Sequence, residues 1–145
     1  MTNAIFELSS LNGTNRFVIN RIDVSDQSGR SVSAAGDING DGIDDIIIGA
    51  DNADPNGNNS GESYVVFGSA SGFGAALELS ALDGTNGFVI NGIDADDRSG
   101  TSVSAAGDVN GDGIDDIIIG AFTACLLYTS PSPRDATLSR MPSSA

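Results

Sequence analysis

Two nine-residue segments carry the side chains best suited to binding chemistry. Residues 37–45 and 108–116 each place oxygen-bearing side chains at positions 1, 3, 5 and 9, with a glycine at position 6. A loop that curls around an ion turns alternate side chains inward, so these oxygens can converge. Calcium is a hard cation that takes six to eight oxygen ligands, and a backbone carbonyl at position 7 can supply one of them. The two segments therefore predict two calcium sites.

The predicted ligands have the same types in both segments. In the first they are Asp37, Asn39, Asp41, the Ile43 carbonyl and Asp45, and in the second Asp108, Asn110, Asp112, the Ile114 carbonyl and Asp116. Asp44 and Asp115 lie directly beside these ligands. So many negative charges folded together would repel one another strongly without a cation.

Two other interpretations of these segments compete with a calcium loop of this kind. An EF-hand needs a glutamate at position 12 and flanking helices, but position 12 here is Ile48 or Ile119, inside an apolar run. Asp-Gly and Asn-Gly pairs also form turns without any ion. Two copies that retain every oxygen-bearing position favour the metal, and magnesium fits less well because it prefers fewer protein oxygens.

Composition excludes several classes of function. The 145 residues carry 20 Asp and Glu against 6 Lys and Arg, a formal charge of -14, which repels nucleic acid and anionic membrane surfaces. The absence of histidine removes the commonest general base, and Cys125, the single cysteine, cannot form an internal disulfide. No signal peptide is visible, and the longest apolar stretch, residues 117–128, is too short for membrane insertion.

An internal repeat sets the organisation of the chain. Residues 7–50 align without gaps to residues 78–121 at an offset of 71, and nine of the 44 pairs differ, which leaves 35 identities. Short β-branched and apolar runs separated by glycine-rich turns recur within each copy, whereas the segment around Leu77 is ambiguous. The expected strands are 31–35, 45–49, 63–67, 87–91 and 102–106. About four strands in roughly 70 residues is typical of a propeller blade, so the predicted fold class is all-β with blades of four antiparallel strands.

The repeat resembles the FG-GAP repeat of integrin alpha-subunit β-propellers and their bacterial relatives. The matching stretches are GDINGDGIDDIIIGA (36–50), GDVNGDGIDDIIIGA (107–121) and YVVFG (64–68). The resemblance covers roughly residues 1–124. The proline of the family motif is absent, because Asp51 and Phe122 stand in its place.

This resemblance implies a seven-bladed propeller with calcium loops between the first and second strands of a blade, held by the ten ligands named above. It also implies an extracellular or cell-surface protein in adhesion or recognition, with an unidentified protein or carbohydrate ligand at the propeller loops. Partner-binding loops would lie in variable segments such as 51–61 and 92–98. The second of these is acidic, which suits a cationic partner or a solvated loop, and a solvated loop is the preferred interpretation. The integrin partner subunit and its metal-dependent adhesion site have no counterpart in these residues.

The chain is too short for a complete propeller, so its length predicts only part of one. Residues 1–124 hold one complete blade, about 31–91, with partial blades on either side, so neighbouring blades of a longer chain are expected partners. A lone blade has open faces and edges, so the isolated chain should be marginally stable or self-associating. Residues 125–145 are rich in Ser and Pro and lose the repeat. They resemble translated sequencing-adaptor read-through, and a disordered linker is the alternative.

The leading functional hypothesis is therefore a non-enzymatic, calcium-binding propeller segment. The alternatives are an accessory propeller of a larger extracellular hydrolase and a purely structural repeat. Catalysis by the Asp44–Asp45 pair is disfavoured because Asp45 is assigned to the ion. Ser28 and Ser99 have no histidine or lysine base to activate them.

Overall fold

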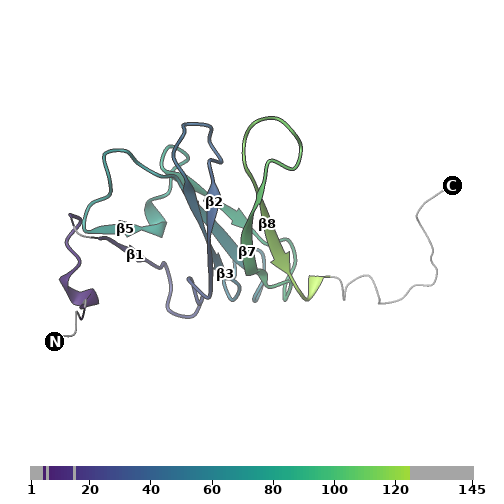
Figure 1. The fold of residues 1–145 in the computed structure, drawn as a ribbon. Helices are drawn as coiled ribbons and strands as arrows, with labels where there is room; N and C mark the ends of the chain where they lie inside the picture. Colours follow the sequence, from purple (N-terminus) through teal and green to yellow (C-terminus); the bar gives the residue numbers. More distant parts are fainter. Residues whose placement is uncertain (1–4, 6, 15, 125–145) are drawn as a thin grey trace, which may run out of the picture.

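The computed structural model describes residues 5, 7–14 and 16–124, and over these residues it is all-β apart from two short 3₁₀ turns. The strands form one four-stranded sheet and two sheets of two strands (Figure 1). The elements are η1 (Leu8–Ser10), β1 (Val18–Asn20), β2 (Ser31–Gly36), β3 (Asp45–Ala50), β4 (Glu62–Val66), β5 (Ala76–Glu78), η2 (Leu79–Ala81), β6 (Gly87–Asn91), β7 (Ser99–Gly107) and β8 (Asp116–Ala121).

The four-stranded sheet is the antiparallel blade that the sequence predicts. Its order is β2-β3-β4-β6, so each strand pairs with the next one along the chain within this sheet. The register places Ile48 opposite both Val32 and Tyr64, and Ile47 opposite Val65. Residues directly opposite one another point to the same face, so this register assigns each apolar side chain to one of two faces.

Both faces of the blade bury apolar side chains, which explains why β3 does not alternate with polar residues. One face carries a cluster that includes Ile48, Tyr64 and Val66, with Leu79 packed on it. The opposite face carries Ile47 and its neighbours, which form a second cluster. The central strands are therefore apolar at most buried positions, with Asp45 of β3 and Ser63 of β4 as buried polar exceptions.

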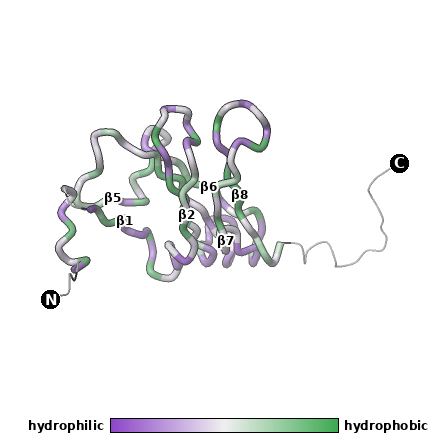
Figure 2. Tube along the Cα trace, in the orientation of Figure 1, coloured by the Kyte–Doolittle hydropathy of each residue, from purple (hydrophilic) through white to green (hydrophobic). Residues whose placement is uncertain are grey.

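The second repeat begins a new blade that packs on the first. β7 and β8 form an antiparallel pair, and β7 lies against β2 and β3. Val103, Ile117 and Ile119 of this pair cover the Ile47 face. The polar connections between strands gather at the two ends of the sheets, as the purple segments of the tube indicate (Figure 2).

On the other side of the blade, β1 pairs with β5 in parallel. The ambiguous segment around Leu77 resolves into β5 followed directly by η2. The expected strand over 63–67 lies one residue earlier, at β4, and the other expected strands are confirmed within a few residues. The domain limits stay predictions, and the interpretation of 125–145 lies outside the described residues.

Candidate metal centre

The first predicted metal loop connects β2 to β3, where hydrogen bonds to side-chain oxygens curl the backbone. Asp37 lies at the centre: its Oδ1 accepts the N–H groups of Gly40 (2.7 Å) and Asp41 (3.0 Å), and its Oδ2 accepts that of Gly42 (2.8 Å). Asn39 Oδ1 accepts the N–H of Asp41 at 3.0 Å, and Asp41 Oδ1 accepts that of Ile43 at 2.9 Å. Gly42 has a φ of 85°, in the region that only glycine enters at little cost.

The second loop, between β7 and β8, repeats this arrangement. Asp108 Oδ1 accepts the N–H groups of Gly111 (2.7 Å) and Asp112 (3.0 Å), and its Oδ2 accepts that of Gly113 (2.8 Å). Asn110 Oδ1 accepts the N–H of Asp112 at 2.9 Å. The two loops thus take one conformation through hydrogen bonds within each loop, so their shape is set locally.

These backbone N–H groups also favour the ionised carboxylate at the first position of the second loop. The pKa of Asp108 is lowered from its usual value chiefly by the hydrogen bond from the Gly113 N–H, with further contributions from Gly111 and Asp112. An acceptor that receives several N–H bonds is stabilised in its charged form. This side chain therefore carries the negative charge that a cation would require.

The last predicted ligand of the first loop, Asp45, begins β3 and is completely buried. Its Oδ2 accepts the N–H of Ile38, in the loop, and its Oδ1 accepts the N–H of Gly68, just after β4, both at 2.8 Å. An added Cβ at Gly68 would collide with the Asp44 carbonyl. Glycine at this position therefore lets the end of β4 approach the loop closely enough for Asp45 to join the two.

In the second loop Asp116 occupies the equivalent place with looser support. Its Oδ2 accepts the Val109 N–H at 2.9 Å, and Asn110 Nδ2 lies 3.4 Å from its Oδ1. Asp116 is half-buried, in contrast to Asp45. The residue that would match Gly68 lies outside the described part of the chain, so the two loops can be compared only as far as residue 124.

The oxygen donors fit a hard cation by chemistry but do not form a ready-made cage. Among residues 5, 7–14 and 16–124, no group of three or more Asp, Glu, His or Cys side chains is placed to hold a metal ion. Asn39 Nδ2 instead donates to Asp41 Oδ2 at 3.1 Å, which ties two predicted ligands to each other. The structure brings the predicted ligands of each loop into one short turn, and the two sites stay predictions.

One residue beside the predicted ligands has a role that spacing could not reveal. Asp115 Oδ2 accepts the N–H of Asp37 at 2.9 Å, and the Asp115 N–H donates to the Asp37 carbonyl at 3.2 Å. An added Cβ at Gly36 would collide with the Asp115 carboxylate. Asp115 therefore joins the second loop to the backbone of the first, across the boundary between the two blades.

Comparison with known proteins places both loops within repeats of one family. The FG-GAP repeat family matches residues 28–66 and 99–122. The chain is also similar to integrin alpha-5 of Xenopus laevis, with 34% identity over 98 residues, which is 64% of this chain and 8% of that protein. The chain thus spans less than a tenth of the length of that relative. No helix in the described residues is long and apolar enough to cross a membrane.

Proposed function

Residues 28–66 and 99–122 are FG-GAP repeats of an integrin-alpha-like propeller segment, and from this premise we propose that the segment binds two structural calcium ions. The observation that carries the proposal is the repetition of one loop conformation with the same oxygen donors at the same positions. Turns that bind no ion do not require the same oxygen-bearing side chains at every matched position of the two loops.

Bound calcium would supply positive charge at the point where the loop carboxylates gather. Asp37, Asn39, Asp41, the Ile43 carbonyl and Asp45 would hold it in the first loop, and Asp108, Asn110, Asp112, the Ile114 carbonyl and Asp116 in the second. Asp45 already links the loop to the end of β4. Because the folded chain assembles these donors and an unfolded chain does not, the binding free energy would add to the free energy of unfolding.

Calcium titration tests this proposal directly. Isothermal calorimetry on the 145-residue chain should show two sites, with dissociation constants of about 10⁻⁴–10⁻³ M as in extracellular calcium modules. The melting temperature should fall when calcium is replaced by a chelator. If no heat of binding is detected at millimolar calcium and the melting temperature is the same with and without calcium, the metal assignment is wrong.

Single substitutions can show that the two calcium sites are independent. A control substitution distinguishes loss of a calcium ligand from simple disruption of a turn. Asp41→Ala and Asp112→Ala should each remove one site and leave the other. The matched control is Asp83→Ala, because Asp83 Oδ1 also accepts a backbone N–H in a turn, from Thr85 at 2.9 Å, outside either loop. If Asp83→Ala lowers the calcium stoichiometry as much as Asp41→Ala, the assignment of ligands is wrong.

The wider role we propose is adhesion or recognition on a surface or secreted protein. Its support is the pairing of the loops 51–61 and 92–98, which bracket the sheet end opposite to the metal loops. Asp96 N–H donates to the Asn58 carbonyl at 2.8 Å, and Arg98 N–H to that of Asn59 at 3.0 Å. Two loops from successive repeats thus form one continuous surface on which a ligand could be held without disturbing the metal loops.

A glycan array and a panel of extracellular-matrix proteins would test this role, both with millimolar calcium. Asn58→Ala, in the exposed loop surface, should weaken any binding found. Ser71→Ala, exposed in the connection after β4 at the opposite end of the sheet, should not. Binding that is insensitive to Asn58→Ala but lost on Ser71→Ala would contradict the assignment of the ligand surface, as would a complete absence of binding to either panel.

A further inference from the structure

The two predicted metal loops touch each other across the boundary between the repeats. Asp115 lies in the second loop, between two residues that supply predicted ligands, Ile114 and Asp116. It is hydrogen-bonded to Asp37, the first predicted ligand of the first loop. We propose that Asp115 is a positioning residue that couples the two calcium sites, so that an ion bound in either loop raises the calcium affinity of the other. This inference rests on the calcium proposal above.

The contact holds the backbone of Asp37 at both of its polar groups. Asp115 Oδ2 accepts the Asp37 N–H at 2.9 Å, and the Asp115 N–H donates to the Asp37 carbonyl at 3.2 Å. The Asp37 carboxylate in turn accepts the N–H groups of Gly40 and Gly42. The position of Asp115 therefore affects the residue around which the first loop is folded.

Two close approaches keep the loops together at this point. An added Cβ at Gly36 would collide with the Asp115 carboxylate, so glycine leaves the room that this carboxylate needs beside Asp37. The position of an added Cβ at Gly40 lies 3.8 Å from Ile114 Cδ1, an ordinary van der Waals distance. Residues 114–115 of the second loop thus approach the first loop at its start and at its fourth residue.

Calcium in the second loop would be held on both sides of Asp115. The Ile114 carbonyl and the Asp116 carboxylate are predicted ligands of the same ion, so an ion bound there restricts the residue between them. A restricted Asp115 holds the Asp37 backbone, and part of the entropy cost of ordering the first loop is then already met. Coupling between two binding equilibria is reciprocal, so calcium in the first loop favours binding in the second to the same extent.

Charge and contact have different consequences for this coupling. Two bound cations repel each other, which opposes coupling. The Asp115 carboxylate is not a predicted ligand, so its negative charge lies beside the first loop and attracts an ion in either site. Asp115→Asn removes this charge but keeps an oxygen that can accept the Asp37 N–H, whereas Asp115→Ala removes both. The two variants therefore separate the contact from the charge.

Calorimetric titration of the 145-residue chain with calcium chloride measures the coupling. Asp41→Ala and Asp112→Ala each leave one site, and so give the association constant of each site alone. The product of the two constants of the wild-type chain should exceed the product of these single-site constants about five-fold or more. With Asp115→Ala added to every chain, the two products should agree. With Asp115→Asn, both sites should weaken but the excess should remain.

Hydrogen exchange detects the same coupling without an ion in the first loop. In the Asp41→Ala chain, calcium bound at the second loop should slow amide exchange in residues 36–42, because Asp115 then holds the Asp37 backbone. Adding Asp115→Ala should abolish this slowing. A residue that merely stabilised the fold would change the exchange equally with and without calcium.

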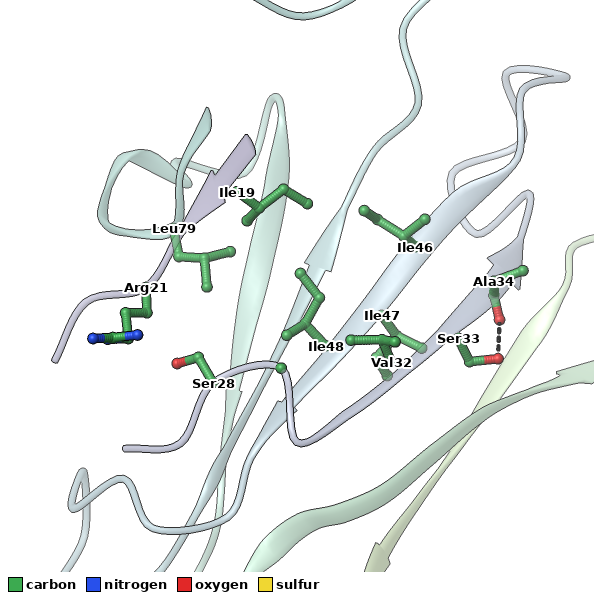
Figure 3. A pocket seen from close by; sticks show the side chains of 11 residues that line it. Ile19, Arg21, Ser28, Val32, Ser33, Ala34, Ile46, Ile47, Ile48 and Leu79 are labelled. Carbon is green, nitrogen blue, oxygen red and sulfur yellow. Dashed lines mark hydrogen bonds between the residues drawn. The ribbon is translucent and has the colours of Figure 1, made fainter. Parts of the chain in front are cut away.

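Two controls separate coupling from neighbouring charge and from general stability. Asp44 matches Asp115 at the repeat offset of 71 and is exposed. Asp44→Ala should weaken calcium binding through its charge and leave the excess unchanged. Ile48 lies on the face of the blade that packs on Leu79 rather than on the second repeat, beside a hollow of about 490 Å³ (Figure 3). Ile48→Val should lower the melting temperature and also leave the excess unchanged.

The possible outcomes distinguish the coupling from the calcium sites themselves. If the wild-type chain binds no calcium, both proposals are wrong. If two ions bind and the products agree in the wild-type chain, the calcium proposal stands and the coupling is wrong. The role of Asp115 is wrong if Asp115→Asn loses the excess as completely as Asp115→Ala does, or if Ile48→Val reduces it equally.

Discussion

At the scale of single residues, Asp51 shows what replaces the missing proline of the FG-GAP motif. Its side chain is 1% exposed, and its Oδ2 lies 3.2 Å from Arg30 Nη1 and 3.7 Å from Arg98 Nη1. Arg30 belongs to the first repeat and Arg98 to the second. The buried carboxylate thus holds two arginines across the repeat boundary, and the second repeat, with Phe122 at the matching position, has no such pair among its described residues.

Asp51→Ala should destabilise the chain by about 1–2 kcal/mol. This is less than the about 3–5 kcal/mol lost when a fully buried ion pair is broken, because the Arg30 and Arg98 side chains are 52% and 32% exposed and can return to water. Urea unfolding measures the difference. Asp94→Ala, at an exposed aspartate, is the control and should change the midpoint little; equal losses in both variants would contradict the role of Asp51.

At the scale of elements, β3 depends on close backbone approach from the neighbouring blade. An added Cβ at Gly49 would collide with the Gly100 carbonyl oxygen, which also accepts the Ser31 hydroxyl. Gly120 is the matching residue of β8, and its added Cβ would meet only the Ser102 side chain at short range. The same residue type is therefore under different constraints in the two repeats.

Gly49→Ala should lower the free energy of unfolding by about 1–3 kcal/mol, the usual cost of overpacking a core. Gly120→Ala should cost less than about 1 kcal/mol, because a hydroxyl side chain can rotate away while a backbone carbonyl cannot. Denaturant midpoints of the two variants, measured side by side at low protein concentration, provide the comparison. A larger loss for Gly120→Ala would contradict the packing of β7 on β3.

At the scale of the whole molecule, stability should be graded across the stack. β3 and β4 are covered on both faces, whereas β1 and β5 form a lone pair of three-residue strands. A two-stranded unit without a blade of its own is marginal in water.

Hydrogen exchange at low protein concentration should therefore protect the amides of β3 and β4 most strongly. The amides of β1 should exchange fastest among the strands, and those of β8 at an intermediate rate, because few contacts oppose local opening at the sides of the stack. Mass spectrometry of peptides spanning 45–50, 62–66 and 18–20 measures this order. Equal protection of β1 and β3 would mean that the chain opens as one cooperative unit.

The sequence by itself determined the repeat, the strands of the blade and the two acidic loops. These features are local: an apolar run, a glycine that needs positive φ, or alternating oxygens are each complete within about ten residues. The loops illustrate this, since Asp37 and Asp108 bind their own backbone N–H groups in the same way in both copies.

Only the tertiary structure decided which of two matched residues has a partner. Ile47 and Ile118 have the same local surroundings in sequence, yet one is buried and the other open. Asp115 reaches Asp37 across 78 residues, and Asp45 reaches Gly68 across 23. Spacing along the chain carries no information about such contacts, because they depend on how one blade stacks on the next.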